Sequence, residues 1–400
     1  MFNKAYIPFR GYFSSPYAKW QGSLAELHSL KLAASTVGRF IKEREIDPAI
    51  FDFLYLGFTI HQYQGFYGGP WVSAMMGAGH IPGVNVAQAC ATSTSCLMSA
   101  ASGVETGIYE TAAVVVGDRT SNGPHIVWPN PSGPGGQVLS ENWMMDNFNS
   151  DPNVGKFSPM ISTAENVAKA AGITKEEVDE LAAHRWSQYE DALADDRAFQ
   201  RGYFFPIVEQ ISKKKTITLE ADEGVTPSKL EVLQGLRPVM EGGVHSFGAQ
   251  THPADGNGFL IVTTEEKARE LAADPGVTVK ICSYGFARVD RGFMPKAPLP
   301  AAKDALSKAG ISLDDVKVIK THNPFTVNDL YFAKELGIDA KSFNNYGSPL
   351  IFGHPQGPTA GRCVMELIEE LAGKGGGYGL FTGCAAGDTG AAMVIKVDAA

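Results

Sequence analysis

Two cysteines and one histidine, far apart along the 400-residue chain, could together carry out acyl transfer. Cys90 and Cys384 each follow a predicted strand, and His354 lies between them in the sequence, within Gly353-His354-Pro355. A thiolate can hold an acyl group, an imidazole can take the proton of that thiol, and a second thiol can move a proton at carbon. These three side chains therefore predict acyl transfer coupled to cleavage of a carbon–carbon bond.

The setting of Cys90 favours a nucleophile. A predicted strand at residues 84–88 leads through Cys90 into a predicted helix at residues 95–107. Because the unpaired amides of a helix N-terminus favour negative charge, we expect the pKa of this thiol to be lowered. The alternative is a small buried side chain without chemistry, which is common for cysteine and is the better interpretation of Cys96.

His354 stands on a turn that is rich in small residues and proline. Gly353, Gly357 and Gly361 allow the backbone to approach other segments closely, and Pro355 fixes the direction in which the chain leaves. A histidine on such a turn, just before a predicted helix, suits a general base. A purely structural histidine is the alternative.

Two further groups end strands of the second half. Cys384 is followed by the glycine-rich residues 385–390, whose N–H groups could form an oxyanion hole. No Gly-Lys-Ser/Thr follows, which excludes a nucleotide phosphate loop. His322 begins the segment His-Asn-Pro-Phe at the end of a predicted strand, and we expect it to lie near His354. Alternatively, His322 satisfies a loop carbonyl.

Composition sets broad limits. A net charge of -9 argues against a general nucleic-acid binder, and no stretch is apolar enough for a transmembrane helix. The N-terminus lacks the apolar core of a signal peptide. Five cysteines without metal-finger spacing predict reduced thiols, no metal or nucleotide cofactor, and a cytoplasmic location.

Helix and strand alternate along the chain, which predicts an α/β protein, and the pattern occurs twice. Residues 33–59 and 301–325 both read as helix, turn and buried strand, and residues 111–120 are echoed by 378–388. Shared offsets of this kind indicate an internal duplication.

Between the two copies the sequence changes character. Loop-forming residues are followed by helical segments, one of which begins at Ile173 or Thr174. We therefore predict an N-terminal half at residues 1–119 and 246–276. An inserted loop domain occupies residues 120–245, and a C-terminal half occupies residues 277–400.

The chain resembles the thiolase family over nearly its whole length. The resemblance rests on five segments, namely the region 11–27, VNVAQACATS, STAENVAKAAGITKEEVDELA, GHPQGPTAGR and the final GCAAGDTGAAMVIK. It implies a five-layered αβαβα fold made of two similar halves with an inserted loop domain. Ketoacyl synthases share this fold, but Cys384 favours a thiolase.

The resemblance also implies roles for individual residues. Cys90 matches the nucleophile that becomes acylated, His354 the base that activates it, and Cys384 the acid/base at the α-carbon. His322 matches the first position of a motif that builds an oxyanion hole for the enolate. The backbone amides of Cys90 and Ala386 match a second oxyanion hole.

The chain departs from the family in the parts that contact the ligand. The usual Cys-x-Gly-Gly-Gly turn of the family reads CAAGD in this chain. The family's TAGNAS segment, whose last serine touches coenzyme A, reads SFGAQT. Thr251 is therefore only a weak candidate for contact with coenzyme A, which is the expected co-substrate. These changes point away from an acetyl-sized substrate. Five large side chains could line a larger pocket, although core packing explains them equally well: Trp71, Trp128, Trp143, Met144 and Met145.

The expected function is thiolytic cleavage of a 3-oxoacyl-CoA in degradation. The start of the chain is similar to divergent thiolases that work with a small zinc-ribbon/OB-fold accessory subunit, one of which cleaves benzoylsuccinyl-CoA. Alternatives are an acetyl-CoA acetyltransferase or condensing synthase in the biosynthetic direction, and a non-catalytic acyl-CoA-binding scaffold. A homodimer or tetramer is expected, without nucleic-acid or membrane partners.

Overall fold

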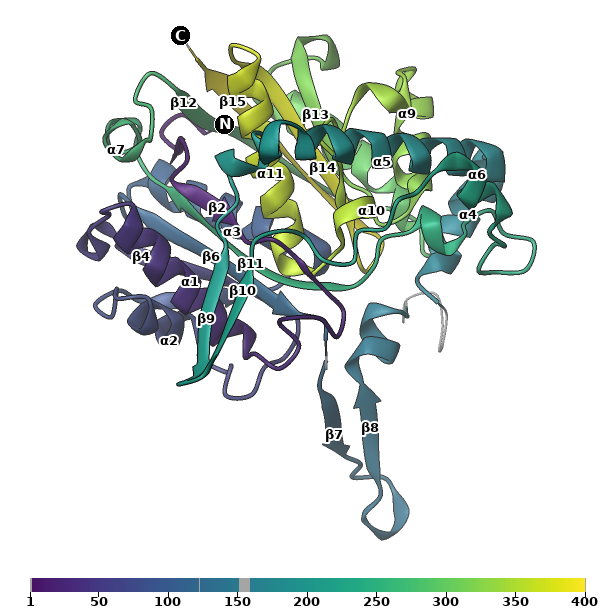
Figure 1. Ribbon diagram of the computed structural model, residues 1–400, viewed down its shortest axis with the longest axis horizontal. Coiled ribbons are helices and arrows are strands. Elements are labelled where there is room, and N and C mark those ends of the chain that lie inside the picture. Colours follow the sequence, from purple (N-terminus) through teal and green to yellow (C-terminus); the bar gives the residue numbers. More distant parts are fainter. Residues whose placement is uncertain (1, 122, 151–158, 400) are drawn as a thin grey trace.

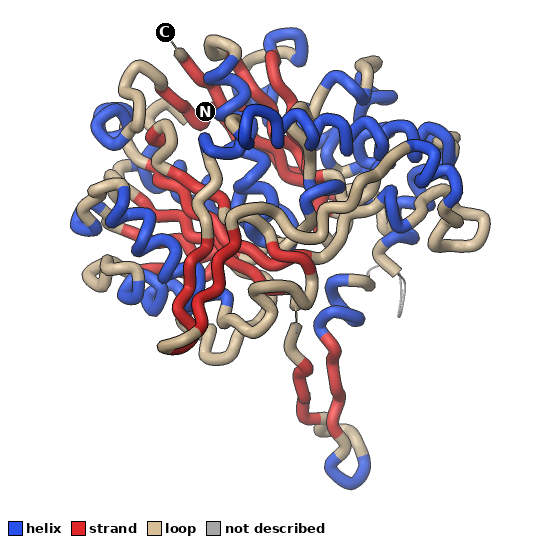
Figure 2. The backbone as a smooth tube through the Cα atoms, viewed as in Figure 1, coloured by secondary structure: helices blue, strands red, loops and turns tan. Residues whose placement is uncertain are grey.

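The computed structural model describes residues 2–121, 123–150 and 159–399. Within these ranges the chain forms two large mixed sheets, with helices between them and on both outer sides (Figures 1 and 2). No helix in the described part is both long and apolar enough to cross a membrane.

The first sheet belongs to the N-terminal half. Its spatial order is β2 (Tyr12–Ser14), β11 (Ala254–Val262), β6 (Ala112–Arg119), β4 (Phe53–Gly57) and β5 (Gly83–Val86), and the short β3 (Ala18–Lys19) also pairs with β11. β11 runs antiparallel to both β2 and β6, whereas β6 runs parallel to β4. Every residue of β11 is buried, because helices cover both faces of the sheet.

The second sheet repeats this topology. Its order is β1 (Tyr6–Pro8), β12 (Thr278–Arg288), β15 (Thr389–Asp398), β14 (Gly377–Ala385) and β13 (Val316–His322). β12 takes the place of β2, β15 that of β11, β14 that of β6 and β13 that of β4, with the same parallel and antiparallel pairings. The predicted duplication is therefore confirmed by the sheet topology.

The helices complete five layers. α1 (Ser29–Glu43) and α2 (Gly68–Met75) cover the outer face of the first sheet, and α8 (Pro298–Ala309) and α9 (Thr326–Leu336) cover that of the second. α3 (Thr92–Thr106) and α11 (Gly357–Gly373) lie between the sheets. Along β14 the side chains alternate, so that Leu380 packs with α8 and Phe381 with the α11 cluster. The αβαβα prediction is correct.

The two central helices approach each other closely at Gly361. A Cβ atom at this position would lie 3.1 Å from the Cβ of Ser93 on α3, so only glycine fits without displacement. The Gly361 amide donates to Ser93 Oγ at 3.0 Å. This contact brings the N-termini of α3 and α11 together, and those ends carry the predicted nucleophile and base.

The segment between β6 and β11 forms several appended elements. They are the hairpins β7 (His125–Pro129) with β8 (Val138–Asn142) and β9 (Ile207–Ser212) with β10 (Lys215–Leu219), the π-helix η4 (Met144–Phe148), and the helices α4 (Ile161–Ala171), α5 (Lys175–Arg197) and α6 (Leu230–Gly235). α7 (Glu265–Leu271) follows β11. The β7–β8 hairpin projects away from the body in Figure 1.

Two details concern the predicted insertion. Thr174 caps α5 and forms a reciprocal capping box with Glu177, which confirms the predicted helix start. Residues 122 and 151–158 lie outside the described residues. The domain boundaries themselves stay a prediction.

Candidate active site

The turn that carries Cys90 lies at the entrance to α3. Residues Ala89–Ala91 form the short 3-10 helix η2, and Thr92 begins α3, so the cysteine stands at a helix start as predicted. Ala89 has a φ of 44°, in the left-handed region. Because a side chain in that region is strained, the turn is held by its surroundings rather than by its own preference.

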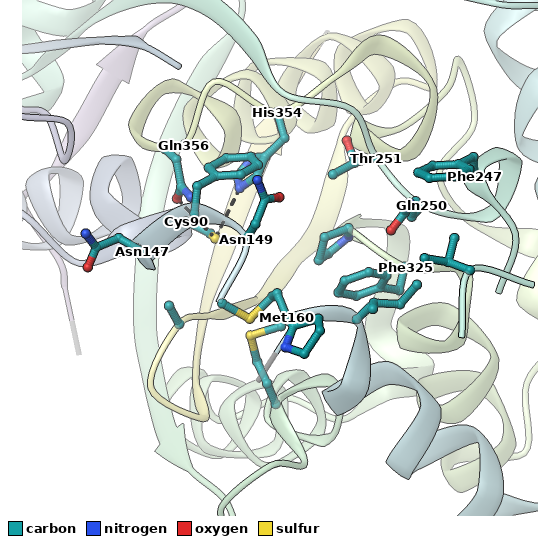
Figure 3. Close-up of a pocket in the computed structure, with 17 residues that line it drawn as sticks. Cys90, Asn147, Asn149, Met160, Phe247, Gln250, Thr251, Phe325, His354 and Gln356 are labelled. Atoms are coloured by element: carbon teal, nitrogen blue, oxygen red, sulfur yellow. Dashed lines mark hydrogen bonds between the residues drawn. The ribbon is translucent and has the colours of Figure 1, made fainter. Parts of the chain in front are cut away.

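Cys90 and His354 are in direct contact although 264 residues separate them. His354 Nε2 lies 3.1 Å from Cys90 Sγ (Figure 3). His354 Nδ1 lies 2.7 Å from Thr359 Oγ1. When Nε2 accepts the thiol proton, Nδ1 carries the ring proton and donates it to the Thr359 hydroxyl oxygen. Thr359 thereby fixes the tautomer that a general base requires.

Burial sets the charge state of this pair. Burial raises the pKa of Cys90 to about 12, and two backbone amides, those of Ala386 and Cys90 itself, act in the opposite direction. The pKa of His354 lies well below its usual range, because the ring is buried and His322 is close. At neutral pH the resting pair is therefore a thiol beside a neutral imidazole.

The expected lowering of the Cys90 pKa is wrong. The cysteine does stand at a helix start, but it is only 8% exposed, and removal of water from the sulfur outweighs the favourable amides. Formation of a Cys90 thiolate would therefore need a base, and the neutral His354 ring lies 3.1 Å from the sulfur.

His322 lies next to His354, with ring centroids 4.3 Å apart. It is 1% exposed, and neither ring nitrogen has a hydrogen-bond partner among the described residues, so it does not satisfy a loop carbonyl. Burial lowers the pKa of His322 to about 3, which keeps the ring neutral. A buried imidazole with free nitrogens can donate to an oxygen that arrives with a substrate.

One ligand atom each from Cys90, His322 and His354 lies within 4.8 Å of the other two. A sulfur and two imidazole nitrogens form a donor set that a soft divalent cation would accept. In the part of the chain that the structure describes, no other group of three or more such side chains is close enough to share an ion. The set coincides with the predicted nucleophile and its neighbours.

Cys384 lies one residue before the end of β14 and is 1% exposed. Burial raises the pKa of its thiol, and the nearby Cys90 raises it further, whereas Asn328 lowers it by donating from Nδ2 to the sulfur at 3.2 Å. Cys384 packs in an apolar cluster with Phe325 and Met294. It interacts with Cys90 but does not itself line the cavity described next.

A cavity of about 250 Å³ opens beside Cys90 and His354 (Figure 3). Its lining combines apolar and aromatic side chains with four carboxamides. The polar members are Asn147, Asn149, Gln250, Gln356 and Thr251, and the apolar members include Phe148, Met160, Ile161, Phe247, Met294 and Phe325. No lysine or arginine is found among the described residues of this lining.

Ala386 and Thr251 both line this cavity. The amide of Ala386 acts on the Cys90 sulfur, as its proposed place in an oxyanion hole requires. The Thr251 hydroxyl donates to the Pro349 carbonyl at 2.5 Å, so it is engaged within the protein.

The tryptophans and methionines suggested for a larger pocket do not line the cavity. Trp71 packs against the core of the first half, and Trp143 is buried. Trp128 and Met145 are exposed, Trp128 on the projecting hairpin and Met145 in η4. The aromatic wall comes instead from Phe148, whose ring lies 6.0 Å from that of His354.

Three residues at the reactive atoms were not predicted. Thr359 and Gln356 belong to the GHPQGPTAGR segment, where their spacing around His354 was the available signal. Gln356 has a φ of 73°, and its side chain reaches within 3.4 Å of Cys90 Sγ. Asn328, six residues after His322, gave no signal of its own.

Comparisons with known proteins agree with this geometry. A family model described as "Thiolase, N-terminal domain" matches residues 13–266, and one described as "Thiolase, C-terminal domain" matches residues 276–397. The chain is 29% identical to "Acetyl-CoA acetyltransferase" of Escherichia coli, with 94% of this chain and 95% of the relative covered. It is 32% identical to "3-ketoacyl-CoA thiolase" of Alteromonas mediterranea, with 80% of each covered.

Solved structures are also similar. The acetyl-CoA acetyltransferase of Bacillus anthracis superposes with a TM-score of 0.89 at 26% identity, covering 99% of both chains. Human mitochondrial 3-ketoacyl-CoA thiolase superposes with a TM-score of 0.88 at 24% identity, also covering 99% of both. The class of protein that the fold and these relatives define is an acyltransferase. The chain belongs to the thiolase family.

Proposed function

We propose that this enzyme cleaves a 3-oxoacyl-CoA by thiolysis, with coenzyme A as co-substrate and Cys90 as the residue that carries the acyl group. The observation that carries this proposal is the neutral pair of Cys90 thiol and His354 imidazole at 3.1 Å, beside a cavity that can admit an acyl chain. Membership of the thiolase family supports the same reaction.

In the first half-reaction, Cys90 Sγ attacks the 3-oxo carbon while its proton passes to His354 Nε2. The bond between C2 and C3 breaks, and its electron pair stays on C2 as the enolate of the departing acyl-CoA. The Cys384 thiol gives its proton to C2. Amides of Cys90 and Ala386 stabilise the oxyanion on the attacked carbon, and one such donor contributes roughly 3–4 kcal/mol.

In the second half-reaction, the thiol of coenzyme A attacks the acyl group on Cys90. Its proton passes to the Cys384 thiolate, which restores the thiol. Collapse of the tetrahedral intermediate releases the Cys90 sulfur, which recovers its proton from His354. Both catalytic thiols and the imidazole return to their resting states.

The cavity supports a substrate larger than acetyl. Its volume of about 250 Å³ corresponds to about eight groups the size of one water, at about 30 Å³ each. Aromatic side chains such as Phe148 and Phe325 suit a ring, and the carboxamides suit a carbonyl or carboxylate on the acyl chain. A bulky or aromatic acyl-CoA such as benzoylsuccinyl-CoA, consumed in degradation such as that of toluene, combines these features.

Synthesis in the opposite direction is the second candidate. It is favoured by the relatives named acetyl-CoA acetyltransferase in Escherichia coli and Mycobacterium leprae. A decarboxylating condensing synthase is a variant of this candidate and would consume malonyl thioesters. A non-catalytic scaffold is a third alternative. It would not need the Cys90 thiol, the His354 imidazole and the unpaired nitrogens of His322 to lie together.

The test is a thiolysis assay of the purified protein against 3-oxoacyl-CoAs from four carbons to aryl-substituted chains. We expect the highest kcat/KM with a bulky or aromatic substrate. Preference for acetoacetyl-CoA, together with rapid condensation of acetyl-CoA, would favour the biosynthetic candidate instead. Consumption of malonyl thioesters would identify a condensing synthase.

We further propose a homo-oligomer that assembles through β5. This strand forms the edge of the first sheet, and the neighbouring side chains of Tyr63 and Phe66 are 80% and 93% exposed. An open edge beside exposed aromatic rings suits pairing with a second copy around a twofold axis. Light scattering should give at least twice the chain mass, and a monomer mass for Val84→Lys.

The accessory subunit and the location are also proposals. A zinc-ribbon/OB-fold partner is supported by the resemblance of the N-terminal region alone, and co-expression of such a partner should raise activity. A cytoplasmic location is supported by five cysteines that all remain free.

A further inference from the structure

Cys384 has an unusual environment for a group that must become charged. Its sulfur is buried in an apolar cluster, and the nearby Cys90 and Asp329 both raise the pKa of its thiol. The side chain that donates a hydrogen bond to this sulfur is Asn328, from Nδ2 at 3.2 Å. In the described chain no other side chain is seen to donate to it.

The orientation of the Asn328 amide is fixed by the backbone. Asn328 is the third residue of α9, and its Oδ1 accepts the N–H of Phe325 at 3.3 Å. A flipped amide would place an N–H group against that backbone donor, so Oδ1 stays toward Phe325 and Nδ2 stays toward the sulfur. Asn328 is 2% exposed, and water therefore does not compete for it.

The start of α9 is held rigidly by the next residue. Asp329 accepts two hydrogen bonds from the buried Arg185, at 3.0 and 2.9 Å, and one each from Thr321 and Asn323. These contacts fix the first turn of the helix against β13. A donor on so rigid an element can hold its geometry while the charge on the sulfur changes.

We propose that Asn328 is a catalytic residue that stabilises the Cys384 thiolate through its Nδ2–H group. This inference rests on the proposed function, in which Cys384 loses its proton to the α-carbon and then recovers it from coenzyme A. The thiol gains little from the amide, whereas the thiolate gains a charge-assisted hydrogen bond. Loss of such a bond should slow proton transfer at carbon by roughly 10- to 100-fold.

The experiment separates the two catalytic thiols. Exchange of the α-protons of acetyl-CoA or succinyl-CoA in heavy water reports on Cys384. Transfer of the acetyl group of p-nitrophenyl acetate to Cys90, measured as the burst of p-nitrophenolate, needs no proton from or to Cys384 and reports on Cys90. For Asn328→Ala we expect α-proton exchange to fall by roughly 10- to 100-fold, with acyl transfer within about 3-fold of the parent.

Asn328→Asp is the sharper variant. It keeps the acceptor for the Phe325 N–H but replaces the donor with a carboxylate, so the fold is preserved and the thiolate is disfavoured. The pH at which α-proton exchange reaches half its maximum should rise. Asn166→Ala is the matched control, because Asn166 is a helical asparagine that donates to the Gly292 carbonyl and does not contact the sulfur.

Three results would decide against the inference. They are α-proton exchange within 3-fold of the parent in both Asn328 variants, an equal loss in the two reactions, or the same loss in Asn166→Ala. Failure of the parent enzyme to catalyse either reaction would instead contradict the proposed function. Loss confined to α-proton exchange, with an unchanged melting temperature, would support the role of Asn328.

Discussion

The two halves of the molecule share one sheet topology but contribute different chemistry. In the N-terminal half, Cys90 immediately precedes α3, whose buried residues are hydroxyl-bearing, small or apolar and none of them charged. In the C-terminal half, the start of α11 is preceded by His354, and the strands beside it supply His322 and Cys384. In the proposed mechanism, one half thus provides the nucleophile, and the other provides the groups that move protons.

The interiors of the two central helices also differ. α11 is buried over residues 357–371 and carries charged side chains that find partners inside the protein. Arg362 donates to both carboxylate oxygens of Asp222, at 2.8 and 2.9 Å, and to Glu366 at 3.0 Å. The duplicated scaffold therefore aligns two helix starts, while the second helix also anchors the inserted segment through Asp222.

The largest expected effect comes from removal of the base. For His354→Ala we expect kcat to fall by about 10²- to 10⁴-fold, because the Cys90 thiol then has no neutral imidazole to take its proton. Stopped-flow thiolysis with the best substrate measures this loss. Thr359→Val should reduce kcat less, since it removes only the partner of Nδ1. If the His354→Ala enzyme kept near-parental kcat, His354 from one half would not act as the base for Cys90 from the other half.

The next effect concerns stability and the anchor on α11. For Arg362→Met we expect the free energy of unfolding to fall by about 3–5 kcal/mol, because Asp222 would remain buried without its cation and Glu366 would keep only Lys320 as a cationic partner. Arg201→Met is the matched control, since its ion pair with Asp196 is exposed and surface pairs contribute about 0–1 kcal/mol. Denaturant unfolding of both variants measures the two changes in the free energy of unfolding. Equal losses would show that the buried ion pair of Arg362 with Asp222 stabilises the protein no more than an exposed pair does.

The pH dependence of Cys90 reactivity gives a smaller but diagnostic effect. Because burial raises the pKa of the thiol to about 12, the thiolate fraction should increase about tenfold for each pH unit between 7 and 9. The alkylation rate of the resting enzyme by iodoacetamide, corrected with Cys90→Ala, should follow this slope. A plateau of the alkylation rate below pH 8 would mean that the helix start lowers the pKa of Cys90 more than burial raises it.

Much of the architecture could be predicted from the sequence because its signals are local. The helix, turn and strand of residues 33–59 recur at 301–325, and both copies fold as the pattern indicates. The helix start at Thr174 follows from its capping residues. Cys90 and His354 could be singled out because each stands on a turn of distinctive composition.

What the sequence could not provide are contacts made across the fold. The pKa of Cys90 depends on water that segments from both halves exclude, and its direction was mispredicted for that reason. Asn328 meets Cys384 only because α9 starts beside β14. Trp128 was a reasonable candidate for the pocket by type, but the hairpin that carries it projects away from the body.

The most direct test of the account is to trap the acyl-enzyme. The protein is mixed with an acyl-CoA in the absence of free coenzyme A, quenched in acid and digested, and its peptides are weighed by mass spectrometry. We predict one acyl group on the peptide that contains Cys90, present in the parent and in Cys384→Ala but absent from Cys90→Ser. An acyl group found on Cys384, or on no cysteine during active turnover, would contradict the account.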